Sequence, residues 1–244
     1  MIWAVAGLSV PSPPPIKFNP LRAFHCYPYR TPKPNKVLYL NLFTVRNMKT
    51  EITNLNQLDL GAIYSYSDYL SWRFEELVEL IKGRVSKMSP APSIFHQTVS
   101  ANILTILKIA TKGHSCKVFA APTDVRLFTK DGQGTELVTV VQPDIFVICD
   151  ATKLDEKGCM GSPDLIVEII SPSTASKDIT IKYELYQETG VGEYWLVFPN
   201  EMIVQIFVLQ DGVYQRKGVY SEDAQIPVHT LPGLLVKVEE IFER

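Results

Sequence analysis

The sequence predicts a mixed α/β fold, with a sheet core flanked by helices and an additional hairpin near the C-terminus. Two segments rich in isoleucine and valine, 143–148 and 163–170, are bounded by proline, glycine or aspartate, as short buried strands are. Segments with apolar residues at helical spacing lie before and after these strands. Further along, the Asp211-Gly212 step separates two apolar segments and predicts a hairpin turn.

The first 50 residues differ in composition from the rest of the chain. Residues 1–47 hold eight of the 17 prolines, and residues 1–50 contain seven lysines or arginines and no acidic residue. Proline-rich segments without an amphipathic period usually stay extended and unpacked. We therefore expect residues 1–50 to be unstructured and residues 51–244 to form the folded domain. The apolar start of the chain lacks the basic region of a secretory signal.

The expected domain is acidic. The whole chain has 24 basic and 26 acidic side chains and a formal net charge of −2. Because the first 50 residues take seven of the basic ones, residues 51–244 keep 17 basic and 26 acidic side chains, a net charge of −9. A body with that charge has no general electrostatic affinity for a phosphate backbone. No apolar run reaches the ~20 residues that a membrane-spanning helix needs.

The cysteines indicate neither a zinc site nor a disulfide framework. Cys26, Cys116, Cys149 and Cys159 include no Cys-x-x-Cys pair. Cys149 ends an apolar strand, where we expect a small buried side chain. A reducing cytoplasm is therefore the expected location.

The elements around the two strands follow from periodicity. Apolar residues recur at helical spacing over 66–81, with Ser67 as the N-cap and Gly83 as the stop. A second helix is expected over 93–112. The other expected elements are strands at 84–88, 116–120, 123–128, 136–141, 194–198, 202–209 and 213–220, a turn at 129–135, and a short strand and helical turn in the tail.

Each of the two central strands carries an acid where a buried strand usually holds an apolar side chain. These acids are Asp144 and Glu168. A carboxylate is expensive to bury unless hydrogen bonds, a cation or a metal compensate its charge. This demand is the strongest indication of a functional site in the sequence.

The segment after Glu168 predicts a cation beside it. Pro172 ends the strand, and a helix is expected to begin directly afterwards. In that helix Asp178, Lys182 and Tyr186 lie one turn apart on one face. If this face looks back at the strand end, Lys182 approaches Glu168.

These residues resemble the motifs of the Uma-two family of endonucleases, which belongs to the PD-(D/E)XK restriction-endonuclease-like superfamily. The resemblance covers roughly residues 66–242 and implies a restriction-endonuclease-like mixed sheet core. It also matches the usual start of the family to Met48, so that residues 1–47 would be an over-extended reading frame. The matching motifs are 79–85, Ser89-Pro90, His96-Gln97, Pro143-Asp144, Glu168, 171–174, Asp178, Lys182, Tyr186, 190–197 and 231–234.

The resemblance implies an active site that hydrolyses phosphodiester bonds in nucleic acid, with DNA as the expected substrate. Mg²⁺ or Mn²⁺ is the implied cofactor. The implied catalytic residues are Glu79, Asp144, Glu168 and Lys182, the implied metal ligands are Asp144, Glu168 and Glu79, and the implied substrate contacts are His96 and Tyr186.

Other interpretations remain open. The superfamily usually places its lysine two residues after the strand glutamate, where this chain has Ile170. The acidic domain favours a binding or regulatory protein that keeps the fold without turnover. In the simplest alternative, Asp178 and Lys182 form an ordinary i,i+4 helix pair worth about 0.2–0.5 kcal/mol, which leaves both strand acids unexplained. A homodimer is compatible with either function.

Overall fold

The computed structural model describes residues 51–88, 92–130 and 136–244. These residues form two six-stranded sheets and one two-stranded sheet. The expected unstructured segment 1–50 lies outside the described residues, as does most of the expected turn at 129–135. Among the described helices, none is long and apolar enough to cross a membrane.

One six-stranded sheet contains both strands whose acids were singled out. Its order is β12-β11-β10-β9-β6-β3. Because β9 is parallel to β10 and antiparallel to β6, the sheet is mixed, as predicted. Its strands are β3 (Lys117–Ala120), β6 (Ile145–Ile148), β9 (Leu165–Ile169), β10 (Glu193–Phe198), β11 (Ile203–Gln210) and β12 (Val213–Ser221).

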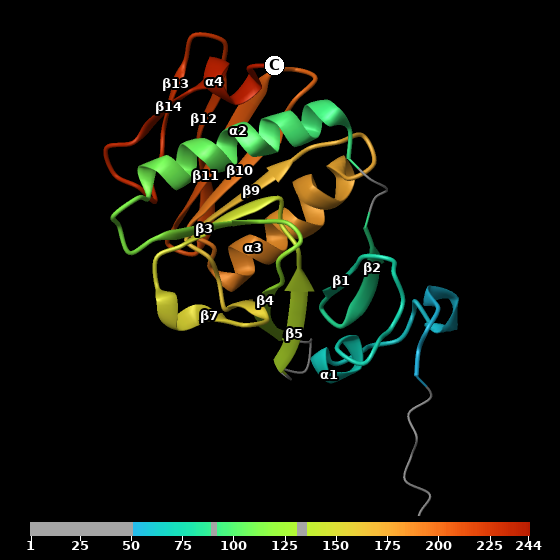
Figure 1. The fold of residues 1–244 in the computed structure, drawn as a ribbon. Helices are drawn as coiled ribbons and strands as arrows, with labels where there is room; N and C mark the ends of the chain where they lie inside the picture. The colour runs from blue at the N-terminus through green and yellow to red at the C-terminus, as the bar shows by residue number, and fades with distance from the viewer. Residues whose placement is uncertain (1–50, 89–91, 131–135) are drawn as a thin grey trace, which may run out of the picture. The chain divides into compact units, whose positions relative to one another are not determined.

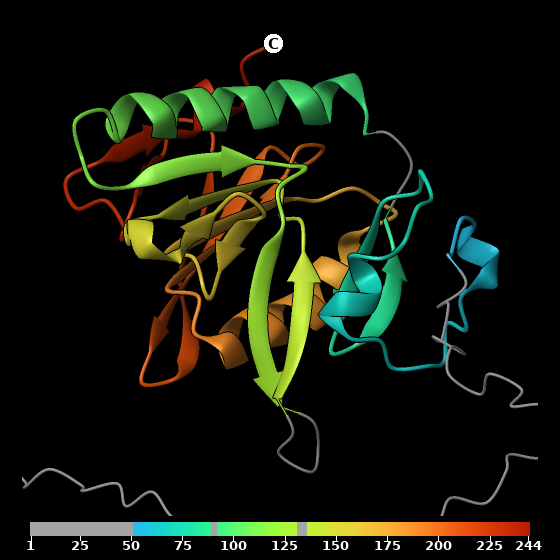
Figure 2. The same cartoon turned by 60° about the horizontal axis from the view of Figure 1, so that its bottom comes forward.

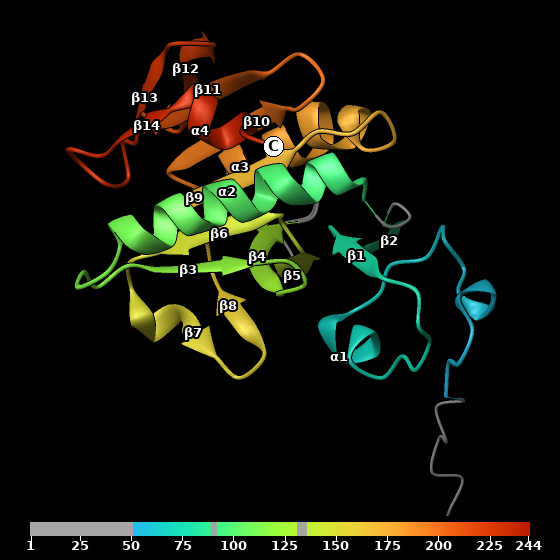
Figure 3. The same cartoon turned by 45° about the horizontal axis from the view of Figure 1, so that its top comes forward.

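Helices cover both faces of this sheet, with α2 (Ile94–Ala110) on one face and α3 (Tyr183–Thr189) on the other (Figures 1 and 3). Side chains along a strand alternate between the two faces. On β9, Val167 therefore packs in the core that α2 covers, and Ile166 packs in the core on the α3 side. The same alternation places Glu168 on the side of α3.

The predicted C-terminal hairpin is confirmed. β11 and β12 are antiparallel and are joined at Asp211 and Gly212, which have φ angles of 49° and 79°. Positive φ at both turn residues gives the turn the twist that a two-residue hairpin requires. The tail adds a strand pair, β13 (Gln225–Pro227) with β14 (Leu235–Lys237), and the short helix α4 (Val238–Phe242).

The other six-stranded sheet has the order β2-β1-β5-β4-β8-β7. Its strands β4 and β5 pair along their whole length, and Figure 2 shows them running side by side away from α2. The strands are β1 (Val78–Ile81), β2 (Arg84–Lys87), β4 (Val125–Lys130), β5 (Glu136–Val141), β7 (Leu154–Asp155) and β8 (Gly158–Met160).

The helix predicted over 66–81 is wrong. Only α1 (Tyr66–Tyr69) is helical in that range, capped by Ser65 rather than Ser67, and the range ends in β1. Aromatic side chains in and just before this range pack on one another without forming a helix. These are Tyr64, Tyr66, Tyr69, Trp72 and Phe74, with neighbouring ring centroids 5.3–6.1 Å apart.

Gly83 belongs to a hairpin turn and does not end a helix. β1 and β2 are antiparallel, with Ile81 opposite Arg84. The two turn residues between them, Lys82 and Gly83, have φ angles of 49° and 76°. A glycine adopts that conformation without the steric cost that other residues incur. The hairpin places Glu79 on a strand of the sheet, where its side chain is fully buried.

The expectation of no disulfide is also wrong. Cys116 and Cys149 are bonded to each other. β3 and β6 are antiparallel, with Lys117 opposite Ile148, so these cysteines form the next cross-strand pair. Their pairing depends on the register of two strands that lie 33 residues apart at this point, and no local motif indicates it.

Candidate active site

A buried charged cluster lies where β9 meets the helix that follows it. Glu168 Oε1 accepts hydrogen bonds from Lys182 Nζ at 2.8 Å and from the Tyr186 hydroxyl at 2.7 Å. Asp178 Oδ1 lies 3.6 Å from the same Nζ. Lys182 and Tyr186 therefore face the strand, as their spacing predicts. Because the Lys182 side chain is only 4% exposed, its contact with Asp178 is not an ordinary surface helix pair.

The helix that carries Lys182 is wound irregularly. Lys177–Lys182 is π-helical, and α3 continues the helix in regular α-helical form. In an α-helix, residues five apart lie on different sides, whereas the wider π turn brings them to the same side. Lys177 and Lys182 consequently both reach Glu79. π-helical turns occur frequently at functional sites.

Glu79 joins the cluster from β1 and binds a lysine with each carboxylate oxygen. Its Oε1 lies 2.9 Å from Lys182 Nζ, and its Oε2 lies 2.7 Å from Lys177 Nζ. The backbone N–H of Gln142 donates to Oε1 at 3.2 Å. Lys177 was not predicted as a site residue. In the sequence it looks like any solvated lysine on a helix.

Asp144 lies at the edge of the cluster, with its side chain 23% exposed. Its Oδ2 accepts a hydrogen bond from the backbone N–H of Ile169 at 2.7 Å. The His96 Nε2 lies 3.6 Å from this oxygen and 3.1 Å from the carbonyl oxygen of Ile169. Because a carbonyl oxygen can only accept, Nε2 carries the hydrogen in that bond.

His96 and Tyr186, the two expected substrate contacts, are both buried. The hydroxyl of Tyr186 is bonded to Glu168, and the ring of His96 lies beside Asp144. His96 Nδ1 has no hydrogen-bond partner among the described residues. Both side chains are therefore in place to orient a carboxylate.

Burial and charge separate the pKa values of the clustered groups. Burial alone would raise the pKa of Glu79, but the ammonium groups of Lys182 and Lys177 outweigh it and hold that pKa below its usual value. Burial raises the pKa of Glu168 to about 8, with neighbouring carboxylates adding to the rise and Lys182 opposing it. Burial opposes the charge of Lys182, but Glu168 and Glu79 hold its pKa well above the usual value. Glu79 and Lys182 are thus charged at neutral pH, and Glu168 is mostly protonated.

We expect Glu168 to reduce the stability of the fold as the pH rises from about 5 to 8. Its pKa is about 8 in the folded protein against an ordinary 4.5. The folded state therefore binds more protons than the unfolded state in this window, and the free energy of unfolding falls as the pH rises. One such group contributes at most about 1.4 kcal/mol per pH unit. Urea unfolding across this window should show a smaller loss of stability in Glu168→Gln than in the wild type. Parallel pH profiles for the two proteins would contradict the raised pKa.

The carboxylates of Asp144 and Glu168 fit a divalent cation. Asp144 Oδ1 and Glu168 Oε2 form no hydrogen bond with any described residue. Mg²⁺ is usually held by one or two carboxylates and keeps several waters. Both oxygens of Glu79 are engaged by lysines, and the described part of the chain holds no group of three His, Cys, Asp or Glu placed as metal ligands. Asp144 and Glu168 therefore each leave one oxygen free for a cation, whereas both oxygens of Glu79 are occupied by lysines.

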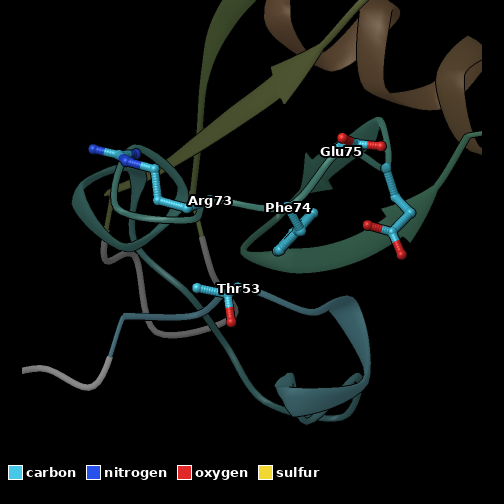
Figure 4. A pocket seen from close by; sticks show the side chains of 5 residues that line it. Thr53, Arg73, Phe74 and Glu75 are labelled. Carbon is cyan, nitrogen blue, oxygen red and sulfur yellow. The ribbon is translucent and has the colours of Figure 1, made fainter.

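Two surface pockets lie outside this cluster. The pocket in Figure 4 contains none of the predicted site residues. A second pocket reaches Gln142, whose backbone N–H contacts Glu79. The buried charged cluster is a stronger indication of the functional site than either pocket, because ionisable groups with shifted pKa values gather at functional sites. The residues that line the pocket in Figure 4 are Thr53, Arg73, Phe74, Glu75 and Glu76.

The fold is a nuclease-like α/β fold. A crystal structure from Anabaena variabilis, described as "a putative nuclease belonging to DUF820", matches with a TM-score of 0.55 and 21% identity. The match covers 73% of this chain and 97% of that chain.

Residues 66–239 match the Uma2 family, described as "Putative restriction endonuclease", and the chain belongs to this family. The resemblance and the fold class predicted from the sequence are thus confirmed. The uncharacterised protein slr1290 of a Synechocystis strain is 25% identical over 150 residues, which cover 60% of this chain and 75% of that protein. The family and the fold together support a nuclease function.

Proposed function

We propose that this chain is a metal-dependent endonuclease that hydrolyses phosphodiester bonds in DNA, with Mg²⁺ or Mn²⁺ as its cofactor. The observation that carries the proposal is the buried ammonium of Lys182, which lies 2.9 Å from Glu79 and 2.8 Å from Glu168. Asp144 is near enough to raise the pKa of Glu168. Oppositely charged groups that shift each other's pKa at one place are typical of a catalytic centre.

Asp144 and Glu168 would hold the cation, with Glu79 as the third metal residue. The cation would supply polarisation of a phosphodiester oxygen and a more acidic water for attack. Glu168 would bind the cation as a carboxylate and would give up the proton that it otherwise keeps.

The other buried side chains orient these carboxylates. Tyr186 and Lys182 fix Glu168 Oε1, and His96 lies against Asp144. The charge of Lys182, held in a site with little water, stabilises the negative charge that develops on the reacting phosphate. Lys182 therefore acts both on the position of Glu168 and on the electrostatics of the transition state.

One observation favours a second function, binding or regulation without turnover. Residues 51–244 carry a net charge of −9, which opposes contact with a phosphate backbone. In that case the cluster would serve the stability of the fold alone.

Cleavage assays test the proposal. The purified protein is incubated with supercoiled plasmid, single-stranded DNA and RNA, each with Mg²⁺, Mn²⁺ or EDTA. We expect DNA to be cut with either ion and to stay intact in EDTA, because the attacking water needs the cation. Cleavage in EDTA would disprove the metal dependence, and cleavage of RNA alone would disprove DNA as the substrate. Binding without cleavage under every condition would favour the second function.

A further inference from the structure

We propose that Lys177 contacts a phosphate of the substrate backbone, whereas Lys182 acts on the reaction without touching the substrate, through its charge and through the carboxylates that it holds. This inference rests on the proposed function, since it assigns the two lysines different tasks in the same site. The motifs of the sequence point only to Lys182. The distinction comes from the number of carboxylates around each ammonium and from how far each side chain is exposed.

The ammonium of Lys182 is enclosed by three carboxylates and is closed to a substrate. Its shortest contact is a hydrogen bond to Glu168. Its Nζ lies 2.8 Å from Glu168, 2.9 Å from Glu79 and 3.6 Å from Asp178. Each carboxylate comes from a different place in the chain, and the side chain is 4% exposed. A phosphate could reach this nitrogen only by displacing a carboxylate that it would repel.

The ammonium of Lys177 has N–H groups that form no hydrogen bond with a described residue. Its Nζ binds one carboxylate oxygen, Glu79 Oε2, at 2.7 Å, and its side chain is 19% exposed. No other described residue forms a hydrogen bond or ion pair with this ammonium. Two of its three N–H groups are therefore free for a ligand while Glu79 still holds the side chain in place.

The surroundings of Lys177 leave it as the cation available on this turn. The exposed side chains that follow it closely carry no charge: Ile179 and Ile181 are 41% and 50% exposed, and Thr180 between them is also exposed. The rest of the domain is acidic, so attraction for a phosphate has to come from individual placed cations rather than from the general field. A charge-assisted hydrogen bond from an ammonium to a phosphate oxygen is a strong contact of this kind.

The test is the salt dependence of DNA binding. Binding of a short DNA duplex is measured in EDTA, where the proposed reaction does not proceed, over a range of salt concentrations. The proteins compared are the wild type, Lys177→Gln, Lys177→Arg and Lys108→Gln. Lys108 is exposed on α2 and serves as the matched loss of one surface charge. Cleavage rates with Mg²⁺ are measured on the same proteins.

We expect the slope of log K against log salt to fall by about 0.9 in Lys177→Gln, the value for one lost phosphate contact in duplex DNA. Cleavage by this variant should fall at least about tenfold. Lys177→Arg should keep most of the salt slope and most of the cleavage rate, because arginine also donates to phosphate. A change in packing alone would not alter the salt slope. If Lys177→Gln does not fold, the double variant with Glu79→Gln removes both partners of the pair and is measured for binding in the same way.

The outcomes separate this inference from the proposed function. The role of Lys177 is overturned if Lys177→Gln keeps the wild-type salt slope and cleavage rate, or if Lys108→Gln lowers both as much as Lys177→Gln does. Either result leaves the nuclease proposal standing. If the wild type binds DNA but never cuts it, a slope that depends on Lys177 supports the phosphate contact while the nuclease proposal fails. If the wild type neither binds the duplex in EDTA nor cuts DNA with Mg²⁺, both are overturned.

Discussion

Replacing Lys182 with methionine should nearly abolish cleavage and destabilise the fold at neutral pH. Methionine keeps most of the aliphatic stem and good helix propensity while removing the charge. Lys182 is buried between Glu79 and Glu168. Its loss leaves Glu79 with Lys177 alone and Asp178 without its ammonium, and breaking a buried ion pair typically costs about 3–5 kcal/mol. Loss of one charge-stabilising group at a reacting centre typically slows the reaction by about 10²–10³-fold.

Urea unfolding and plasmid cleavage at about pH 5 and pH 8 check this expectation. The loss of stability should shrink at pH 5, because protonation neutralises the carboxylates that Lys182 leaves behind. Lys153 offers a control, since its Nζ is held by a single hydrogen bond to the carbonyl oxygen of Ser162 at 2.9 Å. Lys153→Met should cost less stability and leave cleavage unchanged. A Lys182→Met protein that cuts at the wild-type rate would show that this lysine has no part in the chemistry.

The contact between Glu168 and Lys182 could be predicted from the sequence because both of its causes are local. Alternation along β9 sets the face of Glu168, and the spacing of Lys182 and Tyr186 sets the face of the helix. Pro172 fixes the short connection between strand and helix. The C-terminal hairpin was predictable for the same reason, since the Asp211-Gly212 step carries its signal, whereas the mixed sheet was implied by the family resemblance.

The parts that could not be predicted depend on residues far apart in the chain. Glu79 was assigned to a helix because apolar residues recur at helical spacing over 66–81, and the short turn at Lys82 and Gly83 was mistaken for a helix end. The second lysine on Glu79, Lys177, depends on a π-helical turn that no residue pattern indicates. The disulfide between Cys116 and Cys149 depends on the register of β3 and β6.

Asp144→Asn should abolish cleavage, whereas Asp164→Asn should not. Each aspartate follows a proline and precedes a strand. Each also accepts a backbone N–H at 2.7 Å, Asp144 from Ile169 and Asp164 from Cys149. Because β6 and β9 are antiparallel, the two aspartates lie at opposite ends of this strand pair, and Asp144 is the one that acts on Glu168. Asparagine retains an accepting oxygen, so each variant should lose a similar stability, about 1–3 kcal/mol at most.

The rate of plasmid nicking by these three proteins in Mg²⁺ tests most directly whether Asp144 belongs to a metal-dependent catalytic centre. The Asp164→Asn protein measures what the loss of the backbone hydrogen bond does by itself. We predict that the wild type and Asp164→Asn nick the plasmid at similar rates, and that Asp144→Asn is slower by at least about 10²-fold, because it loses a charged ligand of the cation. Equal rates for all three proteins, or the same loss in both variants, would contradict a catalytic centre at Asp144.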